Sequence, residues 1–262
     1  MIKDVMVRLD GSSGDDARLA AVTQIARMFE GHVTALFFNV VPEGHAETAG
    51  KSADQTENLL FERLGRLQLS AVLRRLDIKD PLDISGSALP VVRTADVFVA
   101  LRTNSEASEP KDLIENVLFD GGRHLFLVPE NWTGFTPLES ILVAWNGSRE
   151  SARAMAEALP YLRQAEKVGV LVVEREREPK TDPMMANDAV QHLRHHGIDA
   201  VKYRAVGEED DTADLMVEQC RSFGANLLVM GSYGHSAERD LLPGSTTSRM
   251  LRISPVPLLI AH

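Results

Sequence analysis

The sequence predicts an α/β protein made of two tandem doubly wound domains. Each domain is expected to hold a five-stranded parallel sheet, in the strand order 3-2-1-4-5, with helices on both faces. Two observations predict this class. Short apolar segments alternate with amphipathic helical segments, and the whole alternating pattern occurs twice along the chain.

The repeat begins with two strands that end in the same turn. Lys3–Ser12 aligns with Glu139–Ser148, and each is an apolar strand followed by Asx-Gly-Ser. An amphipathic helix and a second strand follow, at 18–29 and 33–41 in the first half and at 151–162 and 168–173 in the second. Each half therefore opens with a strand-helix-strand unit.

The later strands repeat as well. Ala95–Ala100 corresponds to Ala225–Met230, and His124–Pro129 corresponds to Val256–Ile260. Strands that alternate with helices predict a parallel sheet, and right-handed crossovers leave few topologies for it.

The domain boundary is predicted at Pro129–Pro137, where Pro, Gly and Thr interrupt both periodicities. A cut near residue 136 gives domains 1–136 and 137–262, each long enough to bury a core of its own. Because Trp132 and Phe135 need burial, we expect this linker to pack against a domain.

Composition predicts a soluble cytoplasmic protein. Hydrophobic residues make up 44% and charged residues 25% of the chain, and no apolar run is long enough to span a bilayer. The start at Met1–Asp4 lacks the apolar region of a signal peptide, and one cysteine excludes an intramolecular disulfide. That cysteine, Cys220, lies on the apolar helix 215–223, which favours a buried, unreactive thiol.

The charge balance argues against nucleic acid as a partner. The formal net charge is −10, and acidic residues outnumber basic ones in both halves, so neither half offers the clustered Lys and Arg that a phosphate backbone requires. The run Glu174–Glu178 alternates in sign and is interpreted as a solvated strand exit.

The most informative motif follows the strand at 225–230. Gly231 and Gly234 are followed, after nine intervening residues, by Gly244-Ser245 at the start of a helix. Glycines allow close approach to a pyrophosphate, and a helix N-terminus favours an anion, to which Ser245 and Thr246 can add hydroxyl donors. No Lys follows Gly244, so this is not a Walker loop. The alternative interpretation is a loop that ends in a helix cap.

Three segments together resemble the C-terminal signature of the universal stress protein family. They are Leu227–Ser236, Leu241–Thr247 and Ser254–Ile260. With the internal repeat, the chain as a whole is similar to a tandem-domain bacterial member. In nucleotide-binding members, the first loop and second strand contact adenine and ribose, and the glycines and the following Ser contact phosphates.

Carried onto this chain, the resemblance puts Asn146 and Val172 near the base or ribose. It puts Gly231, Gly234, Gly244 and Ser245 near the phosphates. The candidate nucleotide-binding residues are Asn146, Val172, Met230, Gly231, Gly234, Gly244, Ser245 and Thr246. The family's usual Asp is replaced by Asn146, whose amide lacks a charge-assisted bond to ribose. Trp145 beside it either stacks on the base or fills the cleft.

The first half shows the reverse pattern. Asp10 stands where the family has its Asp, but Arg102–Pro110 lacks glycine and contains Glu106 and Glu109, which would repel a triphosphate. We therefore expect a degenerate domain with a structural or pairing role. Gly121-Gly122 is interpreted as a helix C-cap.

The predicted function is a non-catalytic, nucleotide-responsive stress protein. It would bind ATP or a related adenine nucleotide, with or without Mg²⁺, in the C-terminal domain and present an altered surface to an unidentified protein partner. The closing strands are expected to make the tandem chain an intramolecular pseudo-dimer, and association into a homodimer stays open. Alternatives are a ligand-free dimeric scaffold and a slow ATPase using His235, Arg239 and Asp240. No catalytic or metal-binding residue is assigned, and His192, His195 and His196 are attributed to a helix C-terminus.

Overall fold

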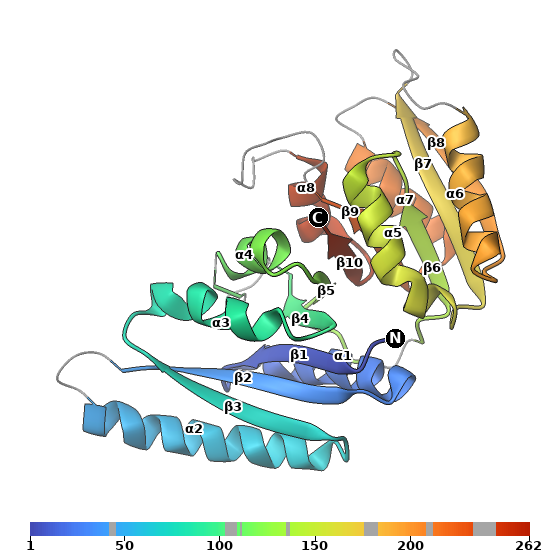
Figure 1. Ribbon diagram of the computed structural model, residues 1–262. Helices are drawn as coiled ribbons and strands as arrows, with labels where there is room; N and C mark the ends of the chain where they lie inside the picture. Colours follow the sequence, from blue (N-terminus) through green and yellow to red (C-terminus); the bar gives the residue numbers. More distant parts are fainter. Residues whose placement is uncertain are drawn as a thin grey trace. The chain divides into compact units, whose positions relative to one another are not determined.

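The computed structural model divides the chain into two compact units, Met1–Phe135 and Thr136–His262. The residues described are 1–41, 46–102, 109–110, 112–134, 137–175, 183–207, 212–232 and 245–262. Each unit is considered by itself. Both are built from alternating strands and helices (Figure 1).

Unit 1 forms a parallel sheet with the strand order β3-β2-β1-β4-β5. Its strands are β1 (Asp4–Leu9), β2 (His32–Val40), β3 (Ala71–Ile78), β4 (Val97–Leu101) and β5 (His124–Val128). Its helices are α1 (Asp15–Phe29), α2 (Ala46–Arg66), the short 3₁₀ helix η1 (Pro81–Asp83), α3 (Ile84–Val92) and α4 (Leu113–Asp120).

Unit 2 repeats this topology with the strand order β8-β7-β6-β9-β10. Its strands are β6 (Ser140–Ala144), β7 (Lys167–Arg175), β8 (Ala200–Gly207), β9 (Leu227–Gly231) and β10 (Leu258–Ala261). Its helices are α5 (Arg149–Leu162), α6 (Pro183–His195), α7 (Thr212–Phe223) and α8 (Thr246–Ile253). In chain order each unit reads 3-2-1-4-5, which confirms the predicted fold class.

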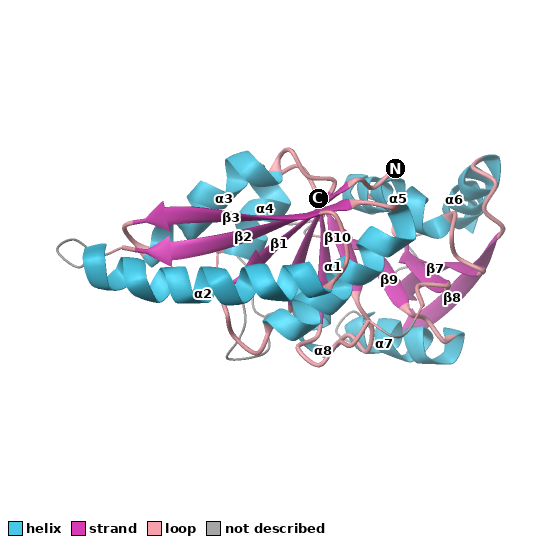
Figure 2. Ribbon diagram, turned by 90° about the horizontal axis from the view of Figure 1, so that it is seen from below, coloured by secondary structure: helices cyan, strands magenta, loops and turns pink. Residues whose placement is uncertain are grey.

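The helices cover the sheet of each unit in two pairs. In unit 1, α1 and α2 lie on one face and α3 and α4 on the other; in unit 2, α5 and α6 share one face and α7 and α8 the opposite one (Figure 2). Right-handed crossovers require this division, because the chain moves outward from the first strand along one face and returns along the other.

Two helix starts and the interpretation of one charged residue differ from the sequence prediction. Helices α1 and α5 begin at Asp15 and Arg149, earlier than the predicted residues 18 and 151, because polar residues form their first turns and carry no apolar periodicity. The interpretation of Glu174 as solvated is wrong. Its side chain is buried in β7 and accepts a hydrogen bond from Arg204 Nη2 at 2.6 Å.

The described part of the linker packs within unit 1. Gly134 has φ +72°, and a Cβ atom there would lie 2.9 Å from the carbonyl oxygen of Ala20 in α1. Trp132 is half-buried. Another loop prediction is confirmed, because Gly121 caps α4 through its N–H to Val117 O, and Gly122 has φ +66°.

Cys220 is predicted to be unreactive in the native protein. Its thiol lies on the buried face of α7, and burial raises its pKa to about 12. Since the thiolate is the nucleophile, we expect alkylation at pH 8 to be about a thousandfold slower than in the unfolded chain. Labelling with a maleimide, with and without guanidinium, measures this ratio on the single cysteine. Equal rates in both conditions would contradict the buried position.

Candidate functional site

In unit 2 the order of the strands reverses at β6, and we call this place the switch point of the unit. Strand β6 pairs with β7 on one side and with β9 on the other. In open α/β sheets, ligands bind beyond the carboxyl ends of the strands at such a point. The residues there follow Ala144 at the end of β6 and Gly231 at the end of β9.

The loop after β6 is an Asx turn. Asn146 Oδ1 accepts a hydrogen bond from Ser148 N at 3.1 Å, and Gly147 has φ +73°, which favours glycine. Unit 1 has the same turn, with Asp10 Oδ1 accepting from Ser12 N at 2.9 Å. The repeated Asx-Gly-Ser segment therefore has a structural reason in both units. The amide oxygen of Asn146 accepts the same hydrogen bond as the carboxylate of Asp10, but Asn146 adds no negative charge to the site.

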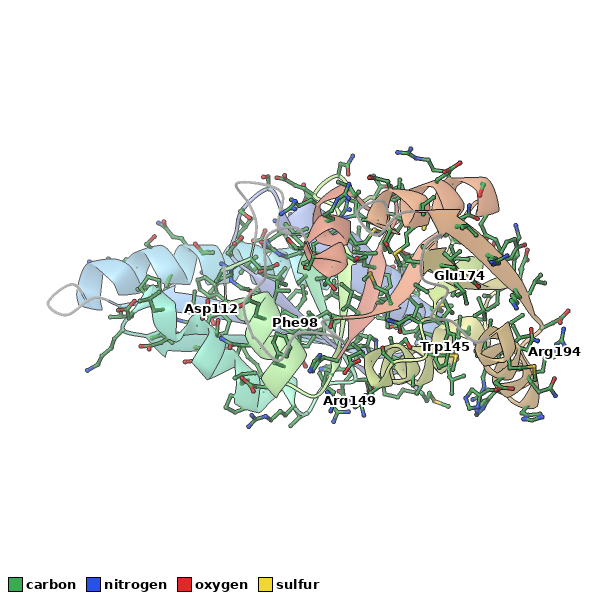
Figure 3. All side chains as sticks on the ribbon, turned by 90° about the horizontal axis from the view of Figure 1, so that it is seen from above. Phe98, Asp112, Trp145, Arg149, Glu174 and Arg194 are labelled. Carbon is green, nitrogen blue, oxygen red and sulfur yellow. The ribbon has the colours of Figure 1, made fainter. Side chains whose placement is uncertain are left out.

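Trp145 leaves one buried donor without a partner. Its backbone N–H donates to Leu171 O at 2.8 Å, which extends the pairing of β6 with β7. Its half-buried side chain holds the Nε1 atom away from solvent, and no hydrogen-bond acceptor reaches it among the described residues. A buried donor of this kind usually finds an acceptor, so this position fits a ligand with an acceptor atom. Figure 3 labels Trp145 together with Arg149 of α5.

Val172 can contribute only backbone atoms. Its side chain is 1% exposed. The last residues paired between β6 and β7 are Ala144 and Leu171, whereas β7 continues to Arg175. The Leu171 C=O accepts from Trp145 N and so faces β6, and successive residues of a strand turn their N–H and C=O groups to opposite sides. The backbone groups of Val172 therefore face β8, where Val172 pairs with Arg204, and the next groups on the β6 side are those of Val173.

Gly231 has a packing role that the sequence did not indicate. A Cβ atom on Gly231 would lie 2.4 Å from the carbonyl carbon of Glu150 and 2.5 Å from Ser151 N. The first turn of α5 therefore packs directly on the end of β9. Only glycine permits this approach, whether or not a phosphate binds. Met230, one residue earlier, is buried.

The N-terminus of α5 already carries its own anion. Glu150 is buried, and although burial alone would raise its pKa, hydrogen bonds from its own backbone N–H and from Ser148, with Arg149 close by, lower the pKa of this carboxyl. Arg149 Nε donates to Glu150 Oε1 at 3.1 Å. An ionised carboxylate at this helix N-terminus competes with any added anion.

The N-terminus of α8 is the second helix start at this edge. Ser245 is its N-cap, and Ser245 Oγ accepts a hydrogen bond from Ser248 N at 3.1 Å. Because α8 crosses from β9 to the parallel strand β10, its N-terminus lies at the carboxyl ends of these strands. The Ser245 oxygen serves the cap, and its hydroxyl hydrogen is still able to donate. Thr246 begins the helix and is half-buried.

The loop before α8 is anchored where it leaves β9. Ser232 N and Ser232 Oγ both donate to Ala261 O, at 3.1 and 3.2 Å. The predicted phosphate contacts Gly234 and Gly244, and His235, Arg239 and Asp240, lie outside the described residues. The structure therefore brings together Asn146, Trp145, Gly231 and the start of α8 through the topology of the sheet.

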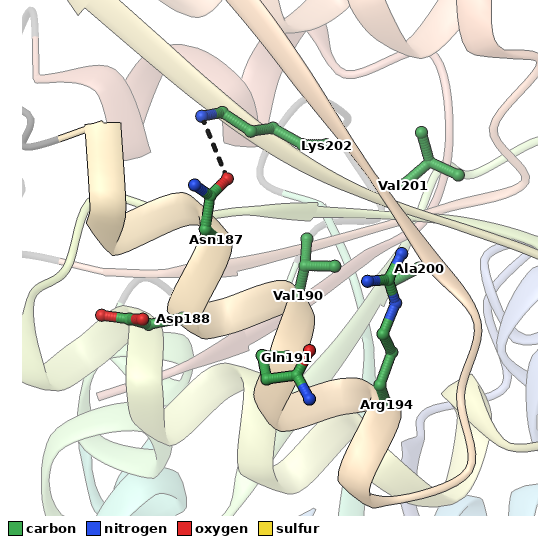
Figure 4. Close-up of a pocket in the computed structure, with 8 residues that line it drawn as sticks. All are labelled: Asn187, Asp188, Val190, Gln191, Arg194, Ala200, Val201 and Lys202. Atoms are coloured by element: carbon green, nitrogen blue, oxygen red, sulfur yellow. Dashed lines mark hydrogen bonds between the residues drawn. The ribbon is translucent and has the colours of Figure 1, made fainter.

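A surface groove in unit 2 lies elsewhere. It runs between α6 and β8, and Lys202 Nζ donates to Asn187 Oδ1 across it at 3.4 Å (Figure 4). Its lining residues are Asn187, Asp188, Val190, Gln191, Arg194, Ala200, Val201 and Lys202. Because β8 contributes its amino-terminal residues, the groove is at the opposite end of the strands from the switch point.

Neither a metal-binding cluster nor a membrane-spanning helix occurs among the described residues. Within them no three His, Cys, Asp or Glu side chains gather in a way that could hold a metal ion. His192 of α6 and His196, just after this helix, contact each other edge to face, with 4.7 Å between their ring centroids. None of the described helices combines the length and apolar character needed to cross a membrane.

Fold and site define a tandem doubly wound α/β protein with a capped helix N-terminus at the switch point of its second unit. The sequence profile of the universal stress protein family matches residues 137–262. The C-terminal unit, residues 137–262, thus matches the universal stress protein family, and the N-terminal unit repeats the same fold.

Solved structures agree with this fold over the whole chain. A universal stress protein from Archaeoglobus fulgidus superposes with a TM-score of 0.78 at 14% identity, covering 98% of this chain and 97% of that one. A putative universal stress protein from Pseudomonas aeruginosa gives a TM-score of 0.64, with 14% identity and coverage of 99% and 93%. A functionally unknown protein from the same species gives 0.63, with 14% identity and coverage of 99% and 92%. No curated protein matches the sequence.

Proposed function

We propose that the C-terminal unit binds ATP or a related adenine nucleotide and that the protein acts as a nucleotide-responsive stress protein without catalysing a reaction. The observation that carries the proposal is the start of α8, with its Ser245 cap, at the carboxyl edge of the sheet. A helix N-terminus with a hydroxyl donor is a ready anion site.

The phosphates would lie at this helix N-terminus. The other helix start at the edge, that of α5, already holds the ionised Glu150 carboxylate, so α8 is the more favourable position for a phosphate. The backbone N–H groups of α8, with Ser245 and Thr246, would donate to phosphate oxygens, and Gly234 and Gly244 would permit close approach.

The base and ribose would lie on the β6 side of the switch point. Trp145 Nε1 offers a buried donor, and β7, which continues beyond its last pair with β6, offers the backbone groups of Val173 beside the predicted contact Val172. Asn146 Oδ1 could also accept from a ribose hydroxyl. Adenine and ribose present both donors and acceptors, which this set can match.

Replacing Ser245 by Asp separates the helix cap from the phosphate site. Asp is as good an N-cap as Ser, so α8 should stay intact, but its negative charge would repel a phosphate. We expect Ser245→Asp to abolish ATP binding in titration calorimetry. Loss of the hydroxyl alone, in Ser245→Ala, should cost about 1.5–3 kcal/mol, or roughly ten- to hundredfold in affinity.

A matched control lies at the other helix start. Ser148 caps α5 through a hydrogen bond from Ser151 N at 3.1 Å, so Ser148→Asp makes the same change at a helix N-terminus where Glu150 already excludes a phosphate. This variant should retain most of its ATP affinity. Unchanged ATP affinity in both Ser245→Asp and Ser245→Ala would remove the proposed phosphate site.

Turnover distinguishes the two remaining alternatives. Backbone N–H groups and one hydroxyl bind ground state and transition state almost equally, so we expect phosphate release far below the usual enzymatic range of roughly 1–1000 per second. Release within that range, abolished by Asp240→Asn with binding retained, would support the ATPase. Absence of nucleotide from the purified protein and from titrations would favour the ligand-free scaffold.

A further inference from the structure

The switch point of unit 1 is filled by side chains of opposite charge. Glu109 follows β4 and accepts three hydrogen bonds: at Oε1 from Arg18 Nε (2.7 Å) and Leu101 N (3.2 Å), and at Oε2 from Arg8 Nη1 (3.1 Å). The donors belong to three elements, β1, α1 and β4, which meet at this edge of the sheet (Figure 1).

These groups are withdrawn from water. The side chains of Arg18 and Glu109 are fully buried, and that of Arg8 is 12% exposed. Two carboxylates balance the arginines further, because Asp15 pairs with Arg18 at 3.0 Å and Asp10 pairs with Arg8 at 3.0 Å. Despite burial, the Glu109 carboxylate raises the pKa of Arg18, so this guanidinium stays charged.

The arrangement has the composition of an oxyanion site. Two guanidinium groups and a backbone N–H converging on one carboxylate are the donors that bind carboxylate and phosphate groups in proteins. The location is also that of a ligand site, because β1 and β4 are the first and fourth strands of the sheet. Unit 2 lacks this set: the residue aligned with Arg8 is Ala144, and no guanidinium projects from that position.

We propose that Arg8, Arg18 and the Leu101 N–H form an oxyanion-binding site at the switch point of unit 1, and that Glu109 occupies this site from within the chain. Its natural ligand is thus the protein's own carboxylate, and a free carboxylate or phosphate binds there only when Glu109 is withdrawn. The proposal does not depend on nucleotide binding by the C-terminal unit.

Glu109→Ala tests the proposal by chemical rescue. The variant removes a carboxylate of the size of acetate and leaves the two arginines without it. We expect sodium acetate to raise the midpoint of thermal unfolding of Glu109→Ala by several degrees more than sodium chloride of equal ionic strength, and inorganic phosphate to act similarly. Acetamide, which matches acetate in shape without its charge, should give no such shift. The midpoint of the wild-type protein should respond equally to acetate and chloride. Subtracting the wild-type change corrects for any anion that binds in unit 2.

Further variants identify the donors and guard against failure to fold. In the double variant Arg8→Met, Glu109→Ala, at least ten times more acetate should be needed for the same rise in the unfolding midpoint. If Glu109→Ala folds only in acetate, the proposal is supported. If it folds in neither salt, Glu109→Ser decides, because a serine leaves room for the anion and the stability of this variant should then depend on acetate or phosphate. A folded Glu109 variant that responds alike to acetate, chloride and acetamide would overturn the proposal.

Discussion

Replacing Arg18 by Ala is expected to lower the free energy of unfolding by about 3–5 kcal/mol, because it removes the buried cation that pairs with both Glu109 and Asp15. All three side chains have no exposed surface. Removing one member of a buried ionic group costs more than the pair contributes, since the remaining charges lose both water and partner. Chemical denaturation followed by circular dichroism measures the change.

The control is an arginine whose ion pair lies in water. Arg66 in α2 approaches Glu62 at 3.5 Å, with the two side chains 76% and 66% exposed. Pairs of this kind contribute about 0.5 kcal/mol or less, so Arg66→Ala should leave stability nearly unchanged. Equal effects of Arg18→Ala and Arg66→Ala would show that the buried cluster tolerates an unpaired charge.

Replacing Gly231 by Ala should lower the free energy of unfolding by about 3 kcal/mol. The added methyl group would meet the backbone of Glu150 and Ser151 at 2.4–2.5 Å, where no side chain can rotate away. Either the first turn of α5 shifts or β9 moves within the sheet, and both movements lose packing contacts that stabilise the folded protein. Denaturation in the absence of nucleotide isolates this effect from any ligand.

This experiment separates two explanations of the glycine. If Gly231 is needed only for close approach to phosphate, Gly231→Ala folds with unchanged stability and loses only nucleotide affinity. Gly65 in α2 provides the control, because nothing lies within 4 Å of a Cβ atom built there. Gly65→Ala is expected to stabilise the protein by roughly 0.5–1 kcal/mol, as alanine does inside a helix.

Much of the fold followed from the sequence because its determinants are local. Alternating apolar strands and amphipathic helices, repeated twice, predicted two doubly wound sheets, and the handedness of crossovers left few topologies for them. The Asx-Gly-Ser turns and the Gly121-Gly122 cap are likewise set by residues close in sequence. The apolar spacing around Cys220 correctly predicted a buried thiol.

The sequence predicted only those parts of the candidate site that depend on residues close together along the chain. The sequence indicated Ser245 at a helix start, and the structure has it as the N-cap of α8. The burial of Trp145 Nε1 without an acceptor among the described residues was missed, since burial of one atom depends on neighbours from other strands. Gly231 was interpreted through phosphate approach, whereas the neighbour it meets, the backbone of Glu150, comes from 81 residues earlier in the chain.

Tertiary structure alone decided the charge pattern of unit 1. By sequence, Glu109 was an acidic residue that would repel a phosphate; in the fold it is the carboxylate held by Arg18 and Arg8, from which it is separated by 91 and 101 residues. No periodicity encodes such a meeting, because the sheet brings the ends of β1 and β4 together only after two intervening strands have been placed. Sequence determines which elements form, since their determinants are neighbours along the chain. The partners of buried charges and of a close-packed glycine are fixed by the crossovers that join distant segments.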